Sequence, residues 1–390
     1  MLTLVIDAMG IGIILPVMPD LIRAVAGTDL AHAAVWGGVM ATSFAVMQFV
    51  FSPTVGNLSD RFGRRPVLLV SLAVMAADYI VMGLAGTIWL LLAGRIAAGI
   101  ASATQSTATA FMADISDPQD KARNFGLVSA AFGFGFVLRP MLGGMLSTLG
   151  LRAPFYGAAL LASGNLVLGL LVLPETVTDT IRRPFEWRRA NPLGAFRHIA
   201  RLPGLRPLMI IVFLNQIAFF VYPAVWAYFT RARFDWSPAM VGYSLAAFGV
   251  SMVVVQGWLI RPIVSRLGDA RTVRLGLVLN MLAFLAIALI PEGWIILALT
   301  PLTALGGIAT PALQSIMSQR ASNRQQGELQ GLLSSVTSVG MILSPLVMTQ
   351  TFAYFSGPAA PVYLPGAPFL LSALLMAICA TVLWISREKT

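Results

Sequence analysis

The chain has 390 residues, of which 57% are hydrophobic and only 11% are charged, and its formal net charge is +10. A soluble domain carries about 25% charged residues, so the composition excludes a soluble globular enzyme, a disordered chain and a secreted disulfide scaffold. It indicates instead a polytopic α-helical membrane protein. Cys379 is the single cysteine and therefore forms no internal disulfide.

A helix that crosses a bilayer needs about 20 mostly apolar residues. Twelve runs in this chain meet that length, and one long polar stretch separates the first six from the last six. The runs cover 2–22, 33–53, 66–86, 88–112, 123–148, 153–173, 207–229, 239–262, 271–290, 294–317, 327–350 and 366–386. The sequence therefore predicts an all-α membrane protein with a six-helix bundle over 1–173, a linker over 174–206 and a second six-helix bundle over 207–390.

The arginines between the runs predict the orientation of the chain. If the runs alternate across the membrane, the outer side carries only Arg23, Arg152, Arg231 and Arg233. The opposite side carries most of the others, including those of the loop 61–65, the linker 174–206 and the segment 261–274. By the positive-inside rule both termini and the linker lie in the cytoplasm, and the net charge indicates no nucleic-acid partner.

An internal repeat relates the two halves at a constant offset of 205 residues. The matching pairs are Arg61 and Arg266, Gly63 and Gly268, Trp89 and Trp294, Gly126 and Gly331, and Pro140 and Pro345. Two parallel six-helix repeats joined by a cytoplasmic linker are the plan of transporters that bind substrate near the bilayer midplane, between the repeats.

The loop after the second run has the sequence Gly-Asn-Leu-Ser-Asp-Arg-Phe-Gly-Arg-Arg over 56–65. Its glycines permit a close helix approach and a tight turn. Its aspartate suits a helix N-terminus, and its arginines suit acidic partners and helix C-termini. We expect a conformational latch between the halves, although a basic loop that happens to contain an aspartate is the alternative. The expected latch residues are Gly56, Asp60, Arg61, Gly63, Arg64, Arg65 and Asp114.

This loop closely resembles the signature loop of the major facilitator superfamily. The segment 93–99 is similar to the superfamily's arginine-containing helix 4 motif, and 133–144 and 173–176 are similar to motifs of its drug/proton antiporters. Within that group, the segments 6–19, 59–69, 311–314 and 326–332 resemble the tetracycline-efflux branch. The resemblance runs along the whole chain and implies the twelve-helix major facilitator fold.

Four ionisable residues lie deep within the predicted spans: Asp7, Asp78, Arg95 and Arg139. A charge at bilayer depth costs about 2.5–3.5 kcal/mol on insertion scales, so such a group faces a cavity or a partner. Asp78 lies near the midplane, where it either carries protons or forms a static ion pair. The family resemblance implies that Asp7, Asp78 and Arg95 serve proton coupling. We expect Arg139 to interact with Asp7, directly or through water.

Polar and aromatic side chains on the spans are candidates for substrate binding, with interhelical hydrogen bonds or interfacial anchoring as the alternatives. The candidates are Gln48, Gln105, Asn215, Gln216, Trp226, Asn280 and Gln314. Neither histidine has metal-ligand spacing, so the sequence predicts no metal and no cofactor.

The chain departs from the tetracycline branch at three positions within the spans. The helix 5 motif, with Pro140, Gly143 and Gly144, has Arg139 where the family has glycine; Met252 replaces a histidine and Asn280 an aspartate.

We expect a monomeric proton-coupled exporter of amphipathic drugs in a bacterial inner membrane, working by alternating access. A facilitator or proton symporter that imports a small metabolite is the alternative. An intramembrane enzyme is disfavoured, because the spans contain no catalytic motif and no histidine.

Overall fold

The computed structural model describes residues 12–116, 135, 137–178, 182, 184–186, 191–192, 194, 203–322 and 325–387. The chain forms two compact units. The first comprises Met1–Thr28, Met40–Pro192 and Pro238–Ala246, and the second comprises Asp29–Val39, Leu193–Ser237 and Ala247–Thr390.

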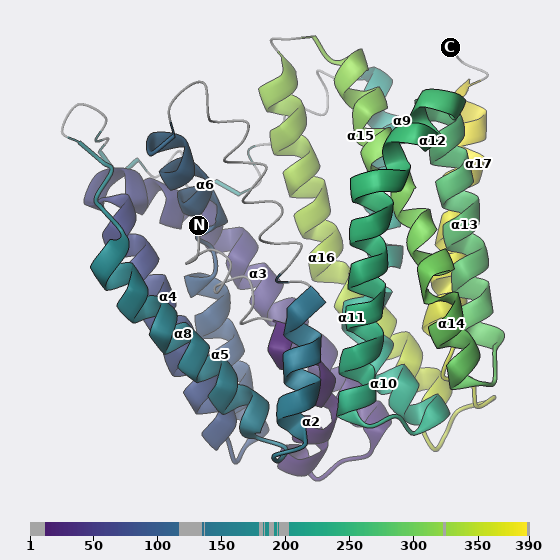
Figure 1. Ribbon diagram of the computed structural model, residues 1–390, viewed down its shortest axis with the longest axis horizontal. Helices are drawn as coiled ribbons and strands as arrows, with labels where there is room; N and C mark the ends of the chain where they lie inside the picture. The colour runs from purple at the N-terminus through teal and green to yellow at the C-terminus, as the bar shows by residue number, and fades with distance from the viewer. Residues whose placement is uncertain are drawn as a thin grey trace. The chain divides into compact units, whose positions relative to one another are not determined.

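The helices of the first unit are mostly apolar. They are η1 (Leu15–Val17), α2 (Met18–Ala26), most of α3 (Leu30–Phe62), α4 (Arg64–Leu84), α5 (Ile88–Ala101), α6 (Gln105–Asp114), a helical stretch over 137–147 and α8 (Ala153–Val172). Helix α4 packs against both α5 and α8, and Figure 1 shows the three side by side. Its buried face includes Leu72, Met75 and Tyr79, which explains why α4 is the centre of this packing.

The second unit is built from longer helices with two local irregularities. Its helices are η4 (Pro203–Leu205), α9 (Arg206–Phe219), α10 (Val221–Phe234), the second part of α11 (Pro238–Val254), the π-turn η5 (Val255–Leu259), α12 (Ile260–Leu267), α13 (Asp269–Leu289), α14 (Gly293–Ala304), the 3₁₀ turn η6 (Leu305–Ile308), α15 (Ala309–Arg320), α16 (Gln326–Ser356) and α17 (Ala367–Arg387). Helix α17 packs against α13 and α9, and α16 packs against α9 and α10.

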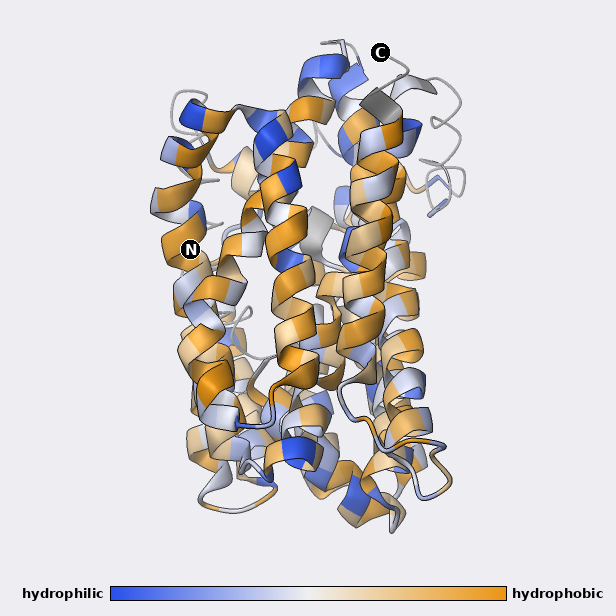
Figure 2. Cartoon of the chain, turned by 90° about the vertical axis from the view of Figure 1, so that its right-hand side faces the viewer, coloured by the Kyte–Doolittle hydropathy of each residue, from blue (hydrophilic) through white to orange (hydrophobic). Residues whose placement is uncertain are grey.

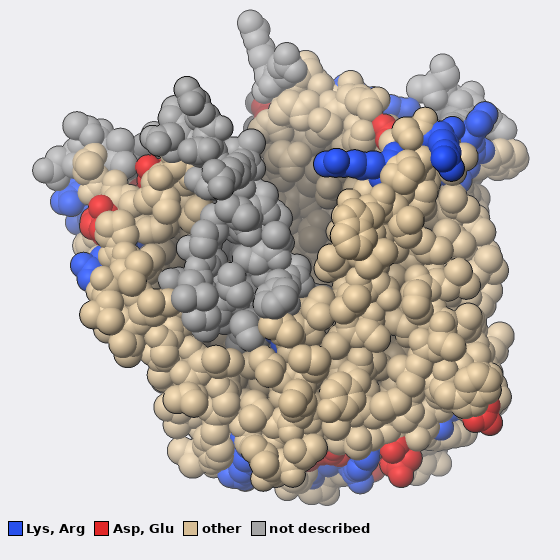
Figure 3. Space-filling model, in the orientation of Figure 1, with Lys and Arg blue, Asp and Glu red and all other residues tan. Residues whose placement is uncertain are grey.

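Within the described residues, nine helices are long and apolar enough to cross a membrane. The predicted span 88–112 is found as α5 followed by α6, and the spans 2–22 and 123–148 are described only in part. Figure 2 shows hydrophobic colour along the middle of the helices and hydrophilic colour near their ends, and Figure 3 shows charged side chains gathered toward those ends. The chain is therefore an all-α, multi-pass membrane protein.

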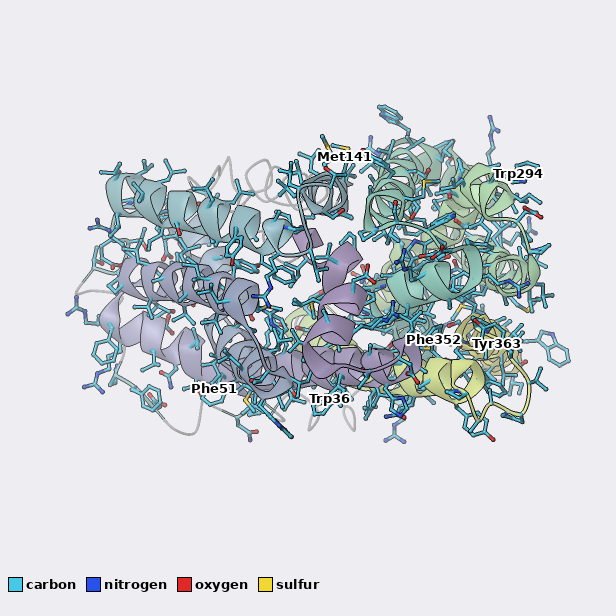
Figure 4. The ribbon with its side chains drawn as sticks, turned by 90° about the horizontal axis from the view of Figure 1, so that it is seen from below. Trp36, Phe51, Met141, Trp294, Phe352 and Tyr363 are labelled. Atoms are coloured by element: carbon cyan, nitrogen blue, oxygen red, sulfur yellow. The ribbon has the colours of Figure 1, made fainter. Side chains whose placement is uncertain are left out.

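The internal repeat is visible in the structure of each unit. Gly63 and Gly268 both have positive φ, at 111° and 72°, and each precedes a helix of 21 residues, α4 and α13. Trp89 and Trp294 are each the second residue of their helices and are 66% and 69% exposed. Figure 4 shows Trp294 at the edge of the second unit. Exposed tryptophans at equivalent helix starts suit the lipid–water interface.

Glycines allow the closest helix contacts in each unit. In the second unit, a Cβ atom on Gly38 would meet the Thr349 side chain and one on Gly37 would meet the Tyr228 hydroxyl, so the start of α3 lies directly on α16 and α10. In the first unit, a Cβ atom on Gly144 would lie 3.0 Å from the Cα of Ala239. These contacts explain why 29–39 and 238–246 belong to the units that they join.

The start of α3 is capped by Asp29. The Asp29 Oδ1 atom accepts a hydrogen bond from the backbone N–H of His32 at 2.8 Å. The ring Nδ1 atom of His32 lies within hydrogen-bonding distance of the same oxygen, at 2.9 Å. The bond from the His32 backbone holds the pKa of the Asp29 carboxyl below its ordinary value. This arrangement is a standard N-cap, in which a carboxylate satisfies an orphan amide of the first turn.

Candidate functional site

The first unit brings two of the four intramembrane charges together. Asp78 on α4 and Arg95 on α5 form an ion pair whose side chains are 1% and 8% exposed. The Arg95 guanidinium also lies over the Phe44 ring, 5.6 Å from its centroid. Both charges are buried, so their mutual attraction offsets part of the free energy needed to place each of them inside a membrane.

Gly94 makes this pairing possible. A Cβ atom at residue 94 would lie 2.6 Å from the Asp78 Oδ1 atom, so any larger side chain would displace the carboxylate. The Gly94–Arg95 sequence therefore supplies the space for the carboxylate and its partner from consecutive residues. A proton that neutralises Asp78 removes its attraction to Arg95. Protonation of Asp78 and its ion pair with Arg95 are therefore alternative states of the carboxyl group.

The loop between α3 and α4 forms a charge network at one end of the first unit. Arg64 Nη1 pairs with Asp60 Oδ1 at 2.5 Å, and Arg64 Nε donates to Asp114 Oδ2 at 3.3 Å. The hydroxyl of Thr176 donates to the same Asp114 oxygen at 3.1 Å. Arg64 thus joins the end of α3 to the end of α6, and Thr176 adds the segment after α8.

Glu175 caps α4 from the other side of this network. Its carboxylate accepts hydrogen bonds from the backbone N–H groups of Arg64 at 2.9 Å and Arg65 at 3.3 Å. A negative charge at a helix N-terminus is favoured by the helix dipole. A Cβ atom on Gly63 would collide with this carboxylate, so the glycine is needed for space as well as for its positive φ.

Sequence reasoning did not assign a role to Glu175 or Thr176, although the motif at 173–176 carried the signal. The remaining loop residues are placed around the network. Arg65 donates to the Leu170 carbonyl at 2.7 Å, Arg61 lies over the Phe62 ring, and the Gly56 carbonyl accepts from Ser59 at 2.7 Å. All these contacts lie inside the first unit, and a latch between the halves stays a prediction.

Arg139 lies against the first helix. A Cβ atom on Gly12 would be 2.5 Å from Arg139 Cδ and 2.7 Å from its Cβ, so the arginine stem occupies the space that Gly12 leaves. A Cβ atom on Gly143 would collide with the backbone of Ile13, and one on Gly242 would collide with the carbonyl oxygen of Pro140. The expected partner, Asp7, lies outside the described residues, so its interaction with Arg139 stays a prediction.

The predicted substrate-binding residues occupy different surroundings. Gln48 donates to the Ser102 carbonyl at 3.2 Å, Asn215 to the Thr310 hydroxyl at 3.2 Å and Asn280 to the Gly306 carbonyl at 3.1 Å. Gln216 packs against Gly340, Gln314 is exposed, and the side chain of Gln105 lies outside the described part. Three candidates thus make the interhelical bonds named as the alternative, and their role in binding substrate stays a prediction.

Trp226 belongs to a buried aromatic cluster in the second unit. Its ring lies 5.8 Å from Tyr222, 6.0 Å from Phe229, 6.3 Å from Trp236 and 6.0 Å from Phe369, and the residue is only 6% exposed. Offset and edge-to-face contacts of this kind stabilise a helical core. The cluster joins α10 to α17, so Trp226 has a packing role whether or not it stacks on a ligand.

Comparison with known proteins identifies the family. The model of the Major Facilitator Superfamily matches residues 1–345 and 208–390. The chain belongs to this superfamily. It is 39% identical to the class C tetracycline resistance protein of Escherichia coli over 97% of this chain and 93% of that protein. It is 37% identical to the class G protein of Vibrio anguillarum over 97% and 94%.

The fold of this superfamily member agrees with a solved relative. The crystal structure of the human organic anion transporter MFSD10 matches with a TM-score of 0.71 and 26% identity, over 98% of this chain and 97% of that one. The expected resemblance to the tetracycline-efflux branch and the expected major facilitator fold are both confirmed.

Two departures from the branch meet at one place in this transporter. Asn280, from α13, and Met252, from α11, both contact η6: Asn280 lies on Gly306, and the Met252 side chain lies on Gly307. The described part of the chain contains no group of three or more histidine, cysteine or acidic residues that could hold a metal ion.

Proposed function

We propose that this chain exports amphipathic drugs of the tetracycline class across the inner membrane of a bacterium, in exchange for protons and by alternating access. The observation that carries the proposal is the 39% identity to the class C tetracycline resistance protein along 97% of the chain. The buried pair of Asp78 and Arg95 supports proton coupling, because it places a titratable carboxylate at membrane depth beside an arginine from which it can separate when protonated.

The proposal includes a division of labour along the chain. Residues 1–173 and 207–390 form two six-helix halves joined by the linker 174–206, with both termini in the cytoplasm. Asp78 exchanges the proton and Arg95 stabilises its charged form. The network of Asp60, Arg64 and Asp114 acts as the latch in one state of the cycle, and Glu175 holds its loop against α4.

Drug susceptibility tests the export function directly. The chain is expressed in an efflux-deficient bacterial host, and growth is measured against a panel that includes tetracycline, with and without a proton uncoupler. We expect the intact chain to raise the tolerated drug concentration and the uncoupler to abolish the gain. An equal tolerance in cells carrying the Asp78→Asn variant would contradict the proposed coupling, and no gain with any drug would contradict drug export.

The direction of transport separates export from the alternative, import of a metabolite. Everted membrane vesicles acidify their lumen when they respire, so a drug/proton antiporter accumulates drug inside them. We expect tetracycline to accumulate in everted vesicles and to be released when the pH gradient is collapsed. Accumulation only in right-side-out vesicles would favour a symporter.

A further inference from the structure

The fourth helix of each half is broken at overlapping positions of the internal repeat. Helix α5 ends at Ala101, the turn 102–104 follows, and α6 continues the span. Helix α14 ends at Ala304, η6 follows, and α15 continues the span. At the offset of 205 residues, Ala101 corresponds to Gly306 and Ser102 to Gly307. A break within a span often marks a functional hinge.

A break inside a membrane span frees carbonyl groups that need donors from elsewhere. In the first unit, the Ser71 hydroxyl, from α4, donates to the Ala101 carbonyl at 2.5 Å. The Gln48 amide, from α3, donates to the next carbonyl, that of Ser102, at 3.2 Å. Side chains from two neighbouring helices therefore hold the two carbonyls at this break.

The second unit has a related arrangement with different residues. The Gly306 carbonyl accepts the backbone N–H of Ala309, and the Asn280 amide, from α13, is a second donor to the same carbonyl at 3.1 Å; Asn280 is only 5% exposed. A Cβ atom on Gly307 would lie 2.8 Å from Met252 Cε. At the offset of 205 residues Gln48 corresponds to residue 253, so Met252 lies one residue from the position equivalent to Gln48. Figure 1 shows α13 beside α14 and α15, which this break connects.

We propose that Ser71 and Asn280 are positioning residues that hold equivalent carbonyls, Ala101 and Gly306, and thereby fix the geometry of the break in the fourth helix of each half. The role requires a hydrogen-bond donor. An amide or a hydroxyl donates at every pH, whereas a carboxyl donates only when it is protonated. Only the transport experiment rests on the proposed function. The hydrogen bonds lie within each unit and can be tested without it.

Hydrogen exchange tests the role without any substrate. Backbone amides of 305–312 are followed in the purified, full-length protein, for the wild type and for Asn280→Ala. The matched control is Thr300→Val, which removes a buried hydroxyl that bonds only to Ile296 in its own helix. We expect exchange to rise about tenfold over 305–312 in Asn280→Ala, equivalent to about 1.4 kcal/mol. Equal exchange in both variants would overturn the proposal for Asn280.

The same measurement applies to the first unit. Ser71→Ala should raise exchange over the break next to Ala101, seen for residues 101–108, and leave 305–312 as in the wild type. If Asn280→Ala does not yield a folded protein, this variant and Asn280→Asp still decide the question. Unchanged exchange at 101–108 would overturn the proposal for Ser71.

Asn280→Asp adds a pH readout that loss of packing would not produce. The protonated aspartic acid can donate to the Gly306 carbonyl, whereas the carboxylate repels it. Exchange over 305–312, as a ratio to the wild type at each pH, should be near one at low pH and rise about tenfold as the pH passes the pKa of the new carboxyl. A ratio that does not change with pH would overturn the donor role.

The charged and titratable groups around α13 are the background for this pH profile. They are Arg261 and Arg266 on α12, Arg320 on α15, Cys379 on α17, Tyr222 beside Phe284, and Asp269, Arg271 and Arg274 on α13 itself. All of them are present in the wild type and in the Thr300→Val control, so the ratio removes their contribution.

Transport then links the hinge to function. Proteoliposomes loaded with tetracycline report the rate relative to the wild type. We expect Asn280→Asp to transport at low pH and to lose about tenfold relative to the wild type at high pH. If the wild type itself moves no tetracycline, the proposed function fails while the exchange data still judge the hinge. A flat transport ratio beside a pH-dependent exchange ratio would overturn the functional part alone.

Discussion

At the residue scale, the pair of Asp78 and Arg95 allows coupling and stability to be separated. Asp78→Asn should abolish uphill, proton-driven transport in proteoliposomes with an imposed pH gradient, because it removes the buried titratable group. Downhill exchange should persist as the sign of a folded protein. The variant also leaves Arg95 buried without its counter-charge, which costs about 3–5 kcal/mol of stability.

The double variant Asp78→Asn with Arg95→Gln provides the control. It removes both charges, so thermal unfolding should return toward the wild-type temperature while uphill transport stays absent. Undiminished uphill transport by Asp78→Asn would reduce the pair to a static brace of the first unit. Recovery of coupling in the double variant would place the proton elsewhere.

Arg139 offers a second prediction at this scale. Its stem fills the space beside Gly12 of the first helix, and Asp7, on the same predicted helix, is the expected partner of its charge. Arg139→Gly, which restores the family residue, should free Asp7 and raise drug transport a few-fold in everted vesicles. Arg139→Lys keeps the charge and should stay near the wild type. Lower transport by Arg139→Gly would indicate that Arg139 binds an anionic group of the substrate.

At the scale of elements, the loop between α3 and α4 should control which state of the cycle is populated. Asp60 shares Arg64 with Asp114, so Asp60→Ala leaves Arg64 with one acidic partner and loosens the end of α3. We expect a changed ratio of inward-open to outward-open molecules, measured by double-label distances across the outer face.

Glu175→Gln is the control for this prediction, since it weakens the cap of α4 and keeps the Asp60–Arg64 contact. It should lower stability by about 1 kcal/mol and change the populations less than Asp60→Ala does. Identical populations in all three proteins would leave Asp60 as a local partner of Arg64 and no more.

The sequence predicts the elements well where one long apolar run forms one helix. The runs 66–86 and 153–173 correspond to α4 (Arg64–Leu84) and α8 (Ala153–Val172). Helix α3 extends to Phe62, beyond the predicted end at 53, because polar residues such as Asn57 and Asp60 end the apolar run but can still continue the helix. Hydropathy also misses the break after Ala101, since a turn of three residues has little effect on the hydropathy averaged over a whole span.

The candidate site was predictable in its members and not in its pairings. Asp78 and Arg95 stand out because charges are rare in apolar spans, yet no spacing rule shows that they meet. The cap formed by Glu175 on α4 joins residues about 110 positions apart. The sequence predicts that Asn280 binds substrate or forms an interhelical hydrogen bond, and only the structure shows that its amide donates to the Gly306 carbonyl.

At the scale of the whole molecule, the distribution of arginines makes a prediction about sidedness. The segments 61–65 and 261–274 are rich in arginine, whereas the predicted outer side carries only four. Cys379 is fully buried, so the wild type has no exposed thiol and single cysteines report cleanly. Ser265, next to Arg266, and Leu149, which is 78% exposed after the fifth span, are suitable positions on the two predicted sides.

A membrane-impermeant maleimide applied to intact cells should label Leu149→Cys and leave Ser265→Cys unlabelled; in everted vesicles the result should reverse. The physical reason is that positively charged loops are retained in the cytoplasm during insertion. The wild type, with Cys379 alone, sets the background and should be labelled far less than the variant that is accessible in each preparation, because its thiol is buried. Labelling of Ser265→Cys in intact cells would invert the topology, and with it the direction in which Asp78 would have to exchange its proton.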